Sequence, residues 1–465
     1  RTLARRGNVP LVAETGGQNA MVVDSSALPE QVVADAIASA FDSAGQRCSA
    51  LRVLCLQEEI AGRVLPMLAG AMAELAVGDP SRLATDVGPI IDEAARAGLE
   101  AHIARLEKTA KLVARAPAPQ AGHGHFIAPV AFEIGSLAEL GREVFGPVLH
   151  VVRFRGGALA RVVEEINATG YGLTFGIHSR LDSTIDFLSG RIRAGNVYVN
   201  RNVVGAVVGV QPFGGEGLSG TGPKAGGPRY LRALVRPAAP QPAGAQPPLP
   251  AADAASSPDC AAAVAAIAKP GTDAIDRGRV LDTIAARAGG DFALVAGAAR
   301  AALADGRERE LAGPTGERNT WSAHPRGLTV ALGDEGGSAS AWLAQAMAAV
   351  AAGNPVLLVA AGDPAVAAKV AAGVREAGWP AIAAVRATTP EWSAIAPLAA
   401  VMAGSPAQAA EAVLAVAARS GARIPVVEPE GAPAHYPAWR LECERTVSVN
   451  TVAAGGNASL LAQMD

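Results

Sequence analysis

Alternating helical and strand patterns between residues 9 and 200 narrow the folds that this chain can adopt. In several segments apolar residues recur at spacings of three and four, as on the buried face of an amphipathic helix. Short continuous apolar runs stand between these segments and are typical of strands buried on both faces. The expected helices cover residues 32–41, 58–76, 92–108, 159–168 and 183–192. The expected strands cover residues 9–13, 51–56, 148–154, 173–179 and 195–200. The alternation predicts an α/β fold with a largely parallel sheet flanked by helices.

A second domain is expected beyond a linker. Residues 236–258 are dense in Pro, Ala and Gln, and few contacts are expected to cross such a stretch. Residues 328–385 then alternate strand, helix, strand, helix and strand, which predicts a Rossmann-like, doubly wound domain. At 465 residues the chain is long enough for two or three domains with substantial cores.

Composition excludes several classes of partner. The 40 basic and 43 acidic residues nearly balance, so we expect no nucleic-acid contact from this segment. The apolar runs are too short for a transmembrane segment. The four cysteines have neither zinc nor redox spacing, which favours a reducing cytoplasm. The seven histidines are interpreted as loop residues, so no metal is expected. Because no methionine opens the chain, we expect a fragment of a longer protein.

Cys48 is the first candidate for chemistry. It follows the Gly-Gln-Arg of residues 45–47, after an expected helix and before an expected strand. A loop between two packed elements can aim a sulfur atom into a cleft. The alternative is a small buried hydrophobe, which is the usual fate of a cysteine.

Glu14 is the second candidate. It stands one residue before the glycines of positions 16 and 17, and glycine allows a backbone to approach a ligand closely. When a thiolate forms a covalent intermediate, a general base is needed later to activate the water that hydrolyses it. A carboxylate can act as this base. The alternative for Glu14 is an ordinary surface carboxylate at the end of a strand.

Four motifs in one order resemble the aldehyde dehydrogenase superfamily. They occupy residues 14–17, 45–48, 143–147 and 212–215, and the last leads to the Ser-Gly of 219–220. The resemblance implies that Cys48 attacks the aldehyde carbon and that Glu14 activates water to release the acid. It also implies NAD as cofactor, with Glu143 binding a ribose diol, Phe145 facing the nicotinamide ring and Gly16 lining that pocket. A tight Phe-Gly-Pro turn with an incidental glutamate is the alternative for residues 143–147.

Substrate selection rests on fewer residues. Ser49, Gly205 and Ala206 resemble a trio that holds a substrate carboxylate through hydroxyl and backbone N–H groups. Phe213 is expected to pack on the aliphatic chain of the substrate, with a core role as the alternative. Ordinary loop packing is the alternative for the trio.

An internal repeat extends the resemblance into the second half. Residues 419–428 parallel residues 5–14, and residues 445–450 echo residues 195–200. The second half has no Gly-Gln-x-Cys and is interpreted as a non-catalytic partial copy. This arrangement resembles the long forms of proline utilization A, which are bifunctional enzymes. The resemblance implies oxidation of L-glutamate γ-semialdehyde to L-glutamate, with FAD only in a missing upstream proline dehydrogenase domain.

The expected domains follow from this resemblance. They are the truncated end of a nucleotide-binding domain (1–20), the aldehyde dehydrogenase catalytic domain (21–200), an anchor loop and return segment (201–235), the linker (236–258), a non-catalytic Rossmann-like domain (259–440) and a β-flap-like tail (441–465). Within the tail, residues 447–461 are expected to add a strand to a sheet edge or to cover an active-site cavity.

Two alternatives stay open at this stage. Either the same machinery oxidises another small-molecule aldehyde, or the chain is an inactive remnant with a scaffolding or dimerisation role in a homodimer. A circular permutation, with residues 310–428 completing the first domain, is disfavoured because the family's oxyanion asparagine and adenosine-binding lysine are not found here, and loss of an oxyanion donor costs on the order of a hundredfold or more in rate. Because both residues are missing, we expect the isolated chain to be inactive and to bind NAD weakly.

Overall fold

The protein is described here from a computed structural model, which defines residues 11–119, 123–235, 258–268, 272, 274–431 and 433–452. The expected linker, most of the first motif of the repeat (residues 5–10) and the end of the tail lie outside the described residues. The chain divides into two compact units. One comprises Ala13–Pro228, Glu310–Trp321 and Arg445–Asp465, and the other comprises Arg1–Val12, Arg229–Arg309 and Ser322–Glu444.

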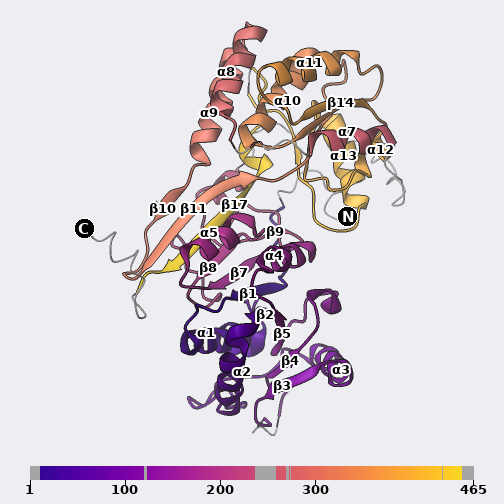
Figure 1. The fold of residues 1–465 in the computed structure, drawn as a ribbon. Helices are drawn as coiled ribbons and strands as arrows, with labels where there is room; N and C mark the ends of the chain where they lie inside the picture. The colour runs from indigo at the N-terminus through magenta and orange to yellow at the C-terminus, as the bar shows by residue number, and fades with distance from the viewer. Residues whose placement is uncertain are drawn as a thin grey trace, which may run out of the picture. The chain divides into compact units, whose positions relative to one another are not determined.

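A ten-stranded sheet organises the first of these units (Figure 1). Its strands in spatial order are β10 (Arg309–Leu311), β11 (Glu317–Pro325), β17 (Glu442–Asn450), β8 (Asn196–Val199), β7 (Thr174–His178), β1 (Asn19–Val23), β2 (Leu51–Gln57), β5 (Val148–Phe154), β4 (Val130–Glu133) and β3 (Lys111–Arg115). From β17 to β4 each neighbouring pair is parallel, and β3 runs antiparallel to β4. The α/β class predicted from the alternation is confirmed.

Amphipathic helices cover this sheet. They are α1 (Pro29–Phe41), α2 (Glu58–Ala73), α3 (Glu93–Thr109), α4 (Leu159–Ala168) and α5 (Asp182–Arg191). Short elements complete the unit: η2 (Asp42–Gly45), η3 (Leu137–Leu140), β6 (Tyr171–Gly172) and β9 (Glu216–Gly217). The central strands β1 and β2 are buried on both faces, which explains why most of their residues are apolar.

The strand expected just before Glu14 is not found among the described residues. Of the expected strand at residues 9–13, positions 11–13 are described and form no strand. Ala13 instead accepts a hydrogen bond from the backbone N–H of Thr221 (3.1 Å). The first described strand is β1, which begins at Asn19 and pairs with β2 and β7. A strand forms where it gains hydrogen-bonded neighbours, and residues 19–23 gain two.

The two similar segments of the internal repeat lie side by side. β17 adds to the sheet beside β8, with Thr446 opposite Asn196 and Val449 opposite Val199. Of the tail segment expected to add a strand, residues 447–450 lie in β17, which begins earlier, at Glu442. β17 lies between β8 and β11 rather than at a sheet edge, and residues 453–461 lie outside the described residues.

The other unit contains a parallel five-stranded sheet of the doubly wound kind that was predicted. Its strands in spatial order are β14 (Ile382–Arg386), β13 (Val356–Ala360), β12 (Thr329–Ala331), β15 (Ala400–Met402) and β16 (Val426–Val427). One core joins the sheet to α8 (Arg277–Ala288), α9 (Phe292–Asp305), α10 (Ala339–Ala352), α11 (Ala365–Glu376) and η4 (Ala438–Leu441). A second core joins it to α7 (Pro258–Ile267), α12 (Thr389–Ser393) and α13 (Pro406–Ala418). The remaining helix is α6 (Tyr230–Leu234).

These compact units are not identical with the functional domains expected from the sequence. Residues 310–321 group with the ten-stranded unit although they follow the expected linker. The expected functional boundaries therefore stay a prediction. Among the helices that the structure describes, none is long and apolar enough to cross a membrane.

Candidate active site

A sharp turn presents Cys48. Ser43, Ala44 and Gly45 in η2 have φ values of 56°, 54° and 64°, so the backbone stays left-handed over three residues. A Cβ atom at Gly45 would lie 2.4 Å from the carbonyl oxygen of Gly146, so no side chain fits there. Non-glycine residues pay for such a conformation, which persists only where the surroundings impose it. The turn leads into the Cys48 loop (residues 46–50), in which Cys48 is exposed.

Two buried side chains fix the Cys48 loop to the sheet. The Asn19 side-chain amide donates hydrogen bonds to the carbonyls of Cys48 (2.7 Å) and Ala50 (2.9 Å). The Thr174 hydroxyl donates to the carbonyl of Ser49 (3.0 Å). Three consecutive carbonyls are thus held from strands β1 and β7, and the loop behaves as a rigid support for the sulfur.

Replacing Asn19 by alanine is expected to loosen this loop. The change leaves two carbonyls without their donor and should lower the local opening free energy of β1 and β2 by roughly 2–4 kcal/mol. Hydrogen–deuterium exchange of the β1 and β2 amides measures the effect. Asn167→Ala is the matched control, because Asn167 also bridges two backbone groups, at Arg191 and Arg193, but on an exposed surface. Equal effects of the two variants would contradict the prediction.

Arg52 links the Cys48 loop to the neighbouring loop that carries Glu143. Its side chain is fully buried in β2. The guanidinium donates to the carbonyls of Gly45 (2.6 Å), Arg47 (3.1 Å) and Gly146 (3.3 Å), and it lies 3.4 Å from the Glu143 carboxylate. A buried charge is tolerated where it is hydrogen-bonded and paired in this way. Sequence reasoning treated residues 51–56 as a plain apolar strand and missed Arg52; an arginine within an apolar run was the available signal.

Glu143 lies against the two glycines that follow Glu14. A Cβ atom at Gly16 would stand 2.3 Å from a Glu143 carboxylate oxygen, and Gly16 has φ +106°, so both space and conformation require glycine. Burial raises the pKa of Glu143, whereas Arg52 and the backbone N–H of Gly17 oppose the rise. Phe145 is 44% exposed beside a hollow of about 540 Å³ that Ser43 and Gln46 also line. The structure therefore brings Gly16, Glu143 and Phe145 to one region.

The Cys48 thiol is not predisposed to ionise. Partial desolvation raises its pKa, the negative charges of Glu14 and Glu143 raise it further, and the backbone N–H groups of Ser49 and Cys48 oppose the rise. Arg52 binds both the Arg47 carbonyl and the Glu143 carboxylate, and it thereby keeps the Cys48 loop beside the Glu143 loop. A thiol of raised pKa needs a base when it reacts as a thiolate.

Glu14 has the properties of such a base. Desolvation raises the pKa of its carboxyl group to about 7, and the positive charge of Lys224 opposes this rise. The residue nevertheless keeps an exposed surface. Its backbone is held by an isolated bridge to Gly220 and by a hydrogen bond from the N–H of Thr15 to the carbonyl of Ser219 (3.2 Å). A carboxylate that titrates near neutral pH can both accept and release a proton.

Lys224 was missed from the sequence and is buried behind Glu14. Its ammonium group donates to Asn196 Oδ1 (2.6 Å) and to the carbonyl of Gly214 (2.9 Å). Gly214 itself adjoins Glu14, because a Cβ atom there would lie 3.1 Å from Glu14 Oε1. A lysine among glycines and an alanine gave no sequence pattern that predicts burial.

The expected substrate residues occupy two further segments. Ser49 is buried in the Cys48 loop, and its carbonyl is the acceptor for Thr174. Gly205 is exposed with φ +79°, and a Cβ atom there would meet open space. Ala206 and Phe213 are partly buried, and Phe213 exchanges backbone hydrogen bonds with Ala225. Their roles toward a substrate stay predictions.

The fold combines a largely parallel sheet with a loop cysteine whose neighbouring loop carries a partly buried glutamate. Residues 2–238 match the model of the aldehyde dehydrogenase family, and the chain belongs to that family.

Three individual members of the family are similar to this chain over about half of its length or nearly all of it. The chain is 46% identical over 459 residues to the bifunctional protein PutA of Escherichia coli, covering 97% of this chain and 33% of that protein. It is 37% identical over 223 residues to the 1-pyrroline-5-carboxylate dehydrogenase of Geobacillus kaustophilus, covering 48% of this chain and 43% of the relative. The solved structure of proline utilization A from Corynebacterium freiburgense is 24% identical with a TM-score of 0.66, covering 97% of this chain and 41% of that one, which shows a shared fold. The chain thus spans about a third of the length of its curated PutA relatives.

Proposed function

We propose that this chain carries the catalytic cysteine and general base of a dehydrogenase that oxidises L-glutamate γ-semialdehyde to L-glutamate. The observation that carries the proposal is that Arg52 joins the Cys48 loop, which is held through Asn19, to the Glu143 carboxylate. Gly16, two residues after Glu14, packs against the same carboxylate. Similarity to PutA along 97% of the chain and to a 1-pyrroline-5-carboxylate dehydrogenase supports this aldehyde and a bifunctional parent protein.

The residues around Glu143 fit a nicotinamide dinucleotide. The carboxylate is anchored by Arg52 and Gly17 and retains oxygen lone pairs for a ribose diol. Phe145 offers an exposed ring face, and Gly16 leaves the backbone open to close approach. When bound, the dinucleotide would supply the hydride acceptor, and we propose that it is NAD. We also propose a cytoplasmic location, where cysteines stay reduced, and the four free cysteines support it.

The reaction follows from the positions of two side chains. The Cys48 sulfur attacks the aldehyde carbon, and its proton passes to a base. The thiohemiacetal oxyanion on Cys48 would then give up hydride to the acceptor that the bound dinucleotide would supply, which leaves a thioester on Cys48. Glu14 then accepts a proton from the water that attacks the thioester, which releases the carboxylic acid and restores the thiol. The rigid Cys48 loop keeps the sulfur in place through both steps, which is the positional contribution to catalysis.

The test is an assay of the protein produced from the complete gene. Two aldehydes are compared, L-glutamate γ-semialdehyde and propanal, each with NAD and with NADP. The measured quantity is the rate at which NADH or NADPH forms. We expect the largest kcat/KM for the semialdehyde with NAD. Turnover of propanal with none of the semialdehyde would reject the substrate while leaving the enzyme class intact, and no NADH from any aldehyde would reject the activity.

The pH dependence should report Glu14. Because the carboxyl group has a pKa of about 7 and acts as a base only when ionised, kcat should fall as pH drops through about 7. Lys224 favours the charged form, so Lys224→Met should move this acidic limb upward by roughly half a unit to one unit. Lys111→Met on exposed β3 is the control. A limb that stays in place, or moves to lower pH, would contradict the assignment.

A further inference from the structure

The loop of residues 203–211, which contains Gly205 and Ala206, is closed by the side chain of Gln211. Gln211 is 3% exposed. Its Oε1 accepts a hydrogen bond from the backbone N–H of Val207 (2.9 Å), and its own N–H donates to the Val207 carbonyl (2.8 Å). One residue therefore fixes the turn that follows Ala206.

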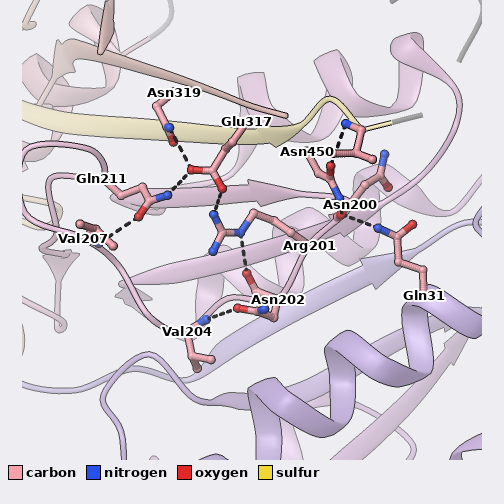
Figure 2. Close-up of polar contacts among 11 residues, drawn as sticks. Gln31, Asn200, Arg201, Asn202, Val204, Val207, Gln211, Glu317, Asn319 and Asn450 are labelled. Atoms are coloured by element: carbon pink, nitrogen blue, oxygen red, sulfur yellow. Dashed lines mark hydrogen bonds and ion pairs between the residues drawn. The ribbon is translucent and has the colours of Figure 1, made fainter. Parts of the chain in front are cut away.

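Glu317, at the start of β11, joins the two ends of this loop (Figure 2). Its carboxylate accepts hydrogen bonds from the side chains of Arg201 and Gln211, which lie 116 and 106 positions away in sequence. The Asn319 amide donates to the same carboxylate at 2.9 Å. The Glu317 side chain is only 13% exposed, so these donors satisfy a largely buried charge.

The tail strand supports the beginning of the same loop. Asn200 adopts φ 54°, and its carbonyl accepts hydrogen bonds from the side chains of Asn450 (3.0 Å) and Gln31 (2.6 Å) (Figure 2). The N–H of Thr451 donates to the carbonyl of Gly316, the residue before Glu317 (2.8 Å). Residues 450 and 451 at the end of β17 therefore bind both Asn200, just before the loop, and Gly316, next to the residue that binds Gln211 at the end of the loop.

We propose that Glu317 is a positioning residue that sets the 203–211 loop in the conformation that receives the carboxylate of the aldehyde substrate. The inference rests on the proposed function. Backbone N–H groups bind an anion well only when the loop that carries them is fixed in advance. Glu317 meets this need from the outside of the loop, and its charge is offset by Arg201, so the pair adds no net repulsion toward a carboxylate.

The experiment compares Glu317→Gln with the unmodified protein from the complete gene. We expect KM for L-glutamate γ-semialdehyde to rise about tenfold, the loss that one charge-assisted hydrogen bond represents, with kcat within about twofold. KM for propanal, which has no carboxylate, should stay unchanged. Glu310→Gln is the matched control, because it removes the same charge from an exposed position of neighbouring β10.

Gln211→Ala supplies a second variant for a double-mutant cycle. If both residues act through the same loop, the double variant should raise KM for the semialdehyde no further than the stronger single variant. Amide hydrogen exchange of residues 203–211 should become faster in Glu317→Gln whatever the aldehyde, so this readout does not depend on the proposed substrate.

The outcomes separate the inference from the proposed function. A selective rise in KM with faster exchange in the loop supports the positioning role. Equal loss with both aldehydes, or no change in KM, overturns it. If the unmodified protein oxidises propanal but not the semialdehyde, the proposed function fails and the carboxylate part of the inference fails with it; unchanged exchange in Glu317→Gln would then also remove the structural part.

Discussion

Replacing Cys48 by alanine is expected to abolish aldehyde-dependent NADH formation. Alanine removes the only group in the proposed site that can form the covalent intermediate, and removal of a nucleophile costs on the order of 10⁴- to 10⁶-fold in kcat. Asn19 and Thr174 bind backbone carbonyls of the loop, which the substitution leaves in place. The loss should therefore appear in kcat, with the fold intact by circular dichroism.

Cys55→Ala is the matched control for this variant. Cys55 lies seven positions further on, fully buried in β2, where burial raises the pKa of its thiol to about 12. The alanine variant should lose some stability through a small cavity and keep its activity within about twofold. Iodoacetamide should label Cys48 in preference to Cys55, because only Cys48 is exposed. More than about 1% residual activity in Cys48→Ala would reject the nucleophile assignment.

Much of the fold could be predicted because local patterns and tertiary structure agree. The strand at Val148–Phe154 and the helix at Leu159–Ala168 were placed to the residue, because five of the seven strand residues are apolar and the helix is strongly amphipathic. Strand β11 was missed because its sequence has no such pattern. Only Asn319 and Trp321 among its residues are buried, and its pairing is decided by distant strands.

Some residues of the candidate site could be found from the sequence, and others could be found only from the structure. Cys48, Glu14 and Glu143 stand beside glycines that a close backbone approach requires, and that local signal can be read from the sequence. Arg52 and Lys224 are buried cations whose partners come from separate loops. No sequence pattern says which carbonyls or carboxylates will surround a buried cation, so these residues become visible only once the chain is folded. Glu317 is the extreme case, because two of its partners, Arg201 and Gln211, lie more than a hundred positions away.

Glu14→Gln should separate the two halves of the reaction. Glutamine keeps the size and the backbone bridge of Glu14 but cannot accept a proton. Loss of a general base costs roughly 10²- to 10⁴-fold, and this loss should fall on thioester hydrolysis. Rapid mixing with the semialdehyde and NAD should then give a burst of about one NADH per active site, followed by a slow steady rate. Mass spectrometry should find the acyl group on Cys48.

The size of the burst also decides which proton Glu14 handles. Because the pKa of the Cys48 thiol is raised and that of Glu14 is about 7, Glu14 is also a candidate to accept the proton of the thiol. If it does so, Glu14→Gln should slow the burst, and raising the pH should restore its rate as the thiol ionises on its own. If Glu14 acts only on water, the burst in Glu14→Gln should have the same rate as in the unmodified protein at every pH. Only the later, steady phase should then be slower. Glu59→Gln, on the exposed first turn of α2, should change neither phase. A steady rate within about threefold of the unmodified protein would reject Glu14 as the base in either step.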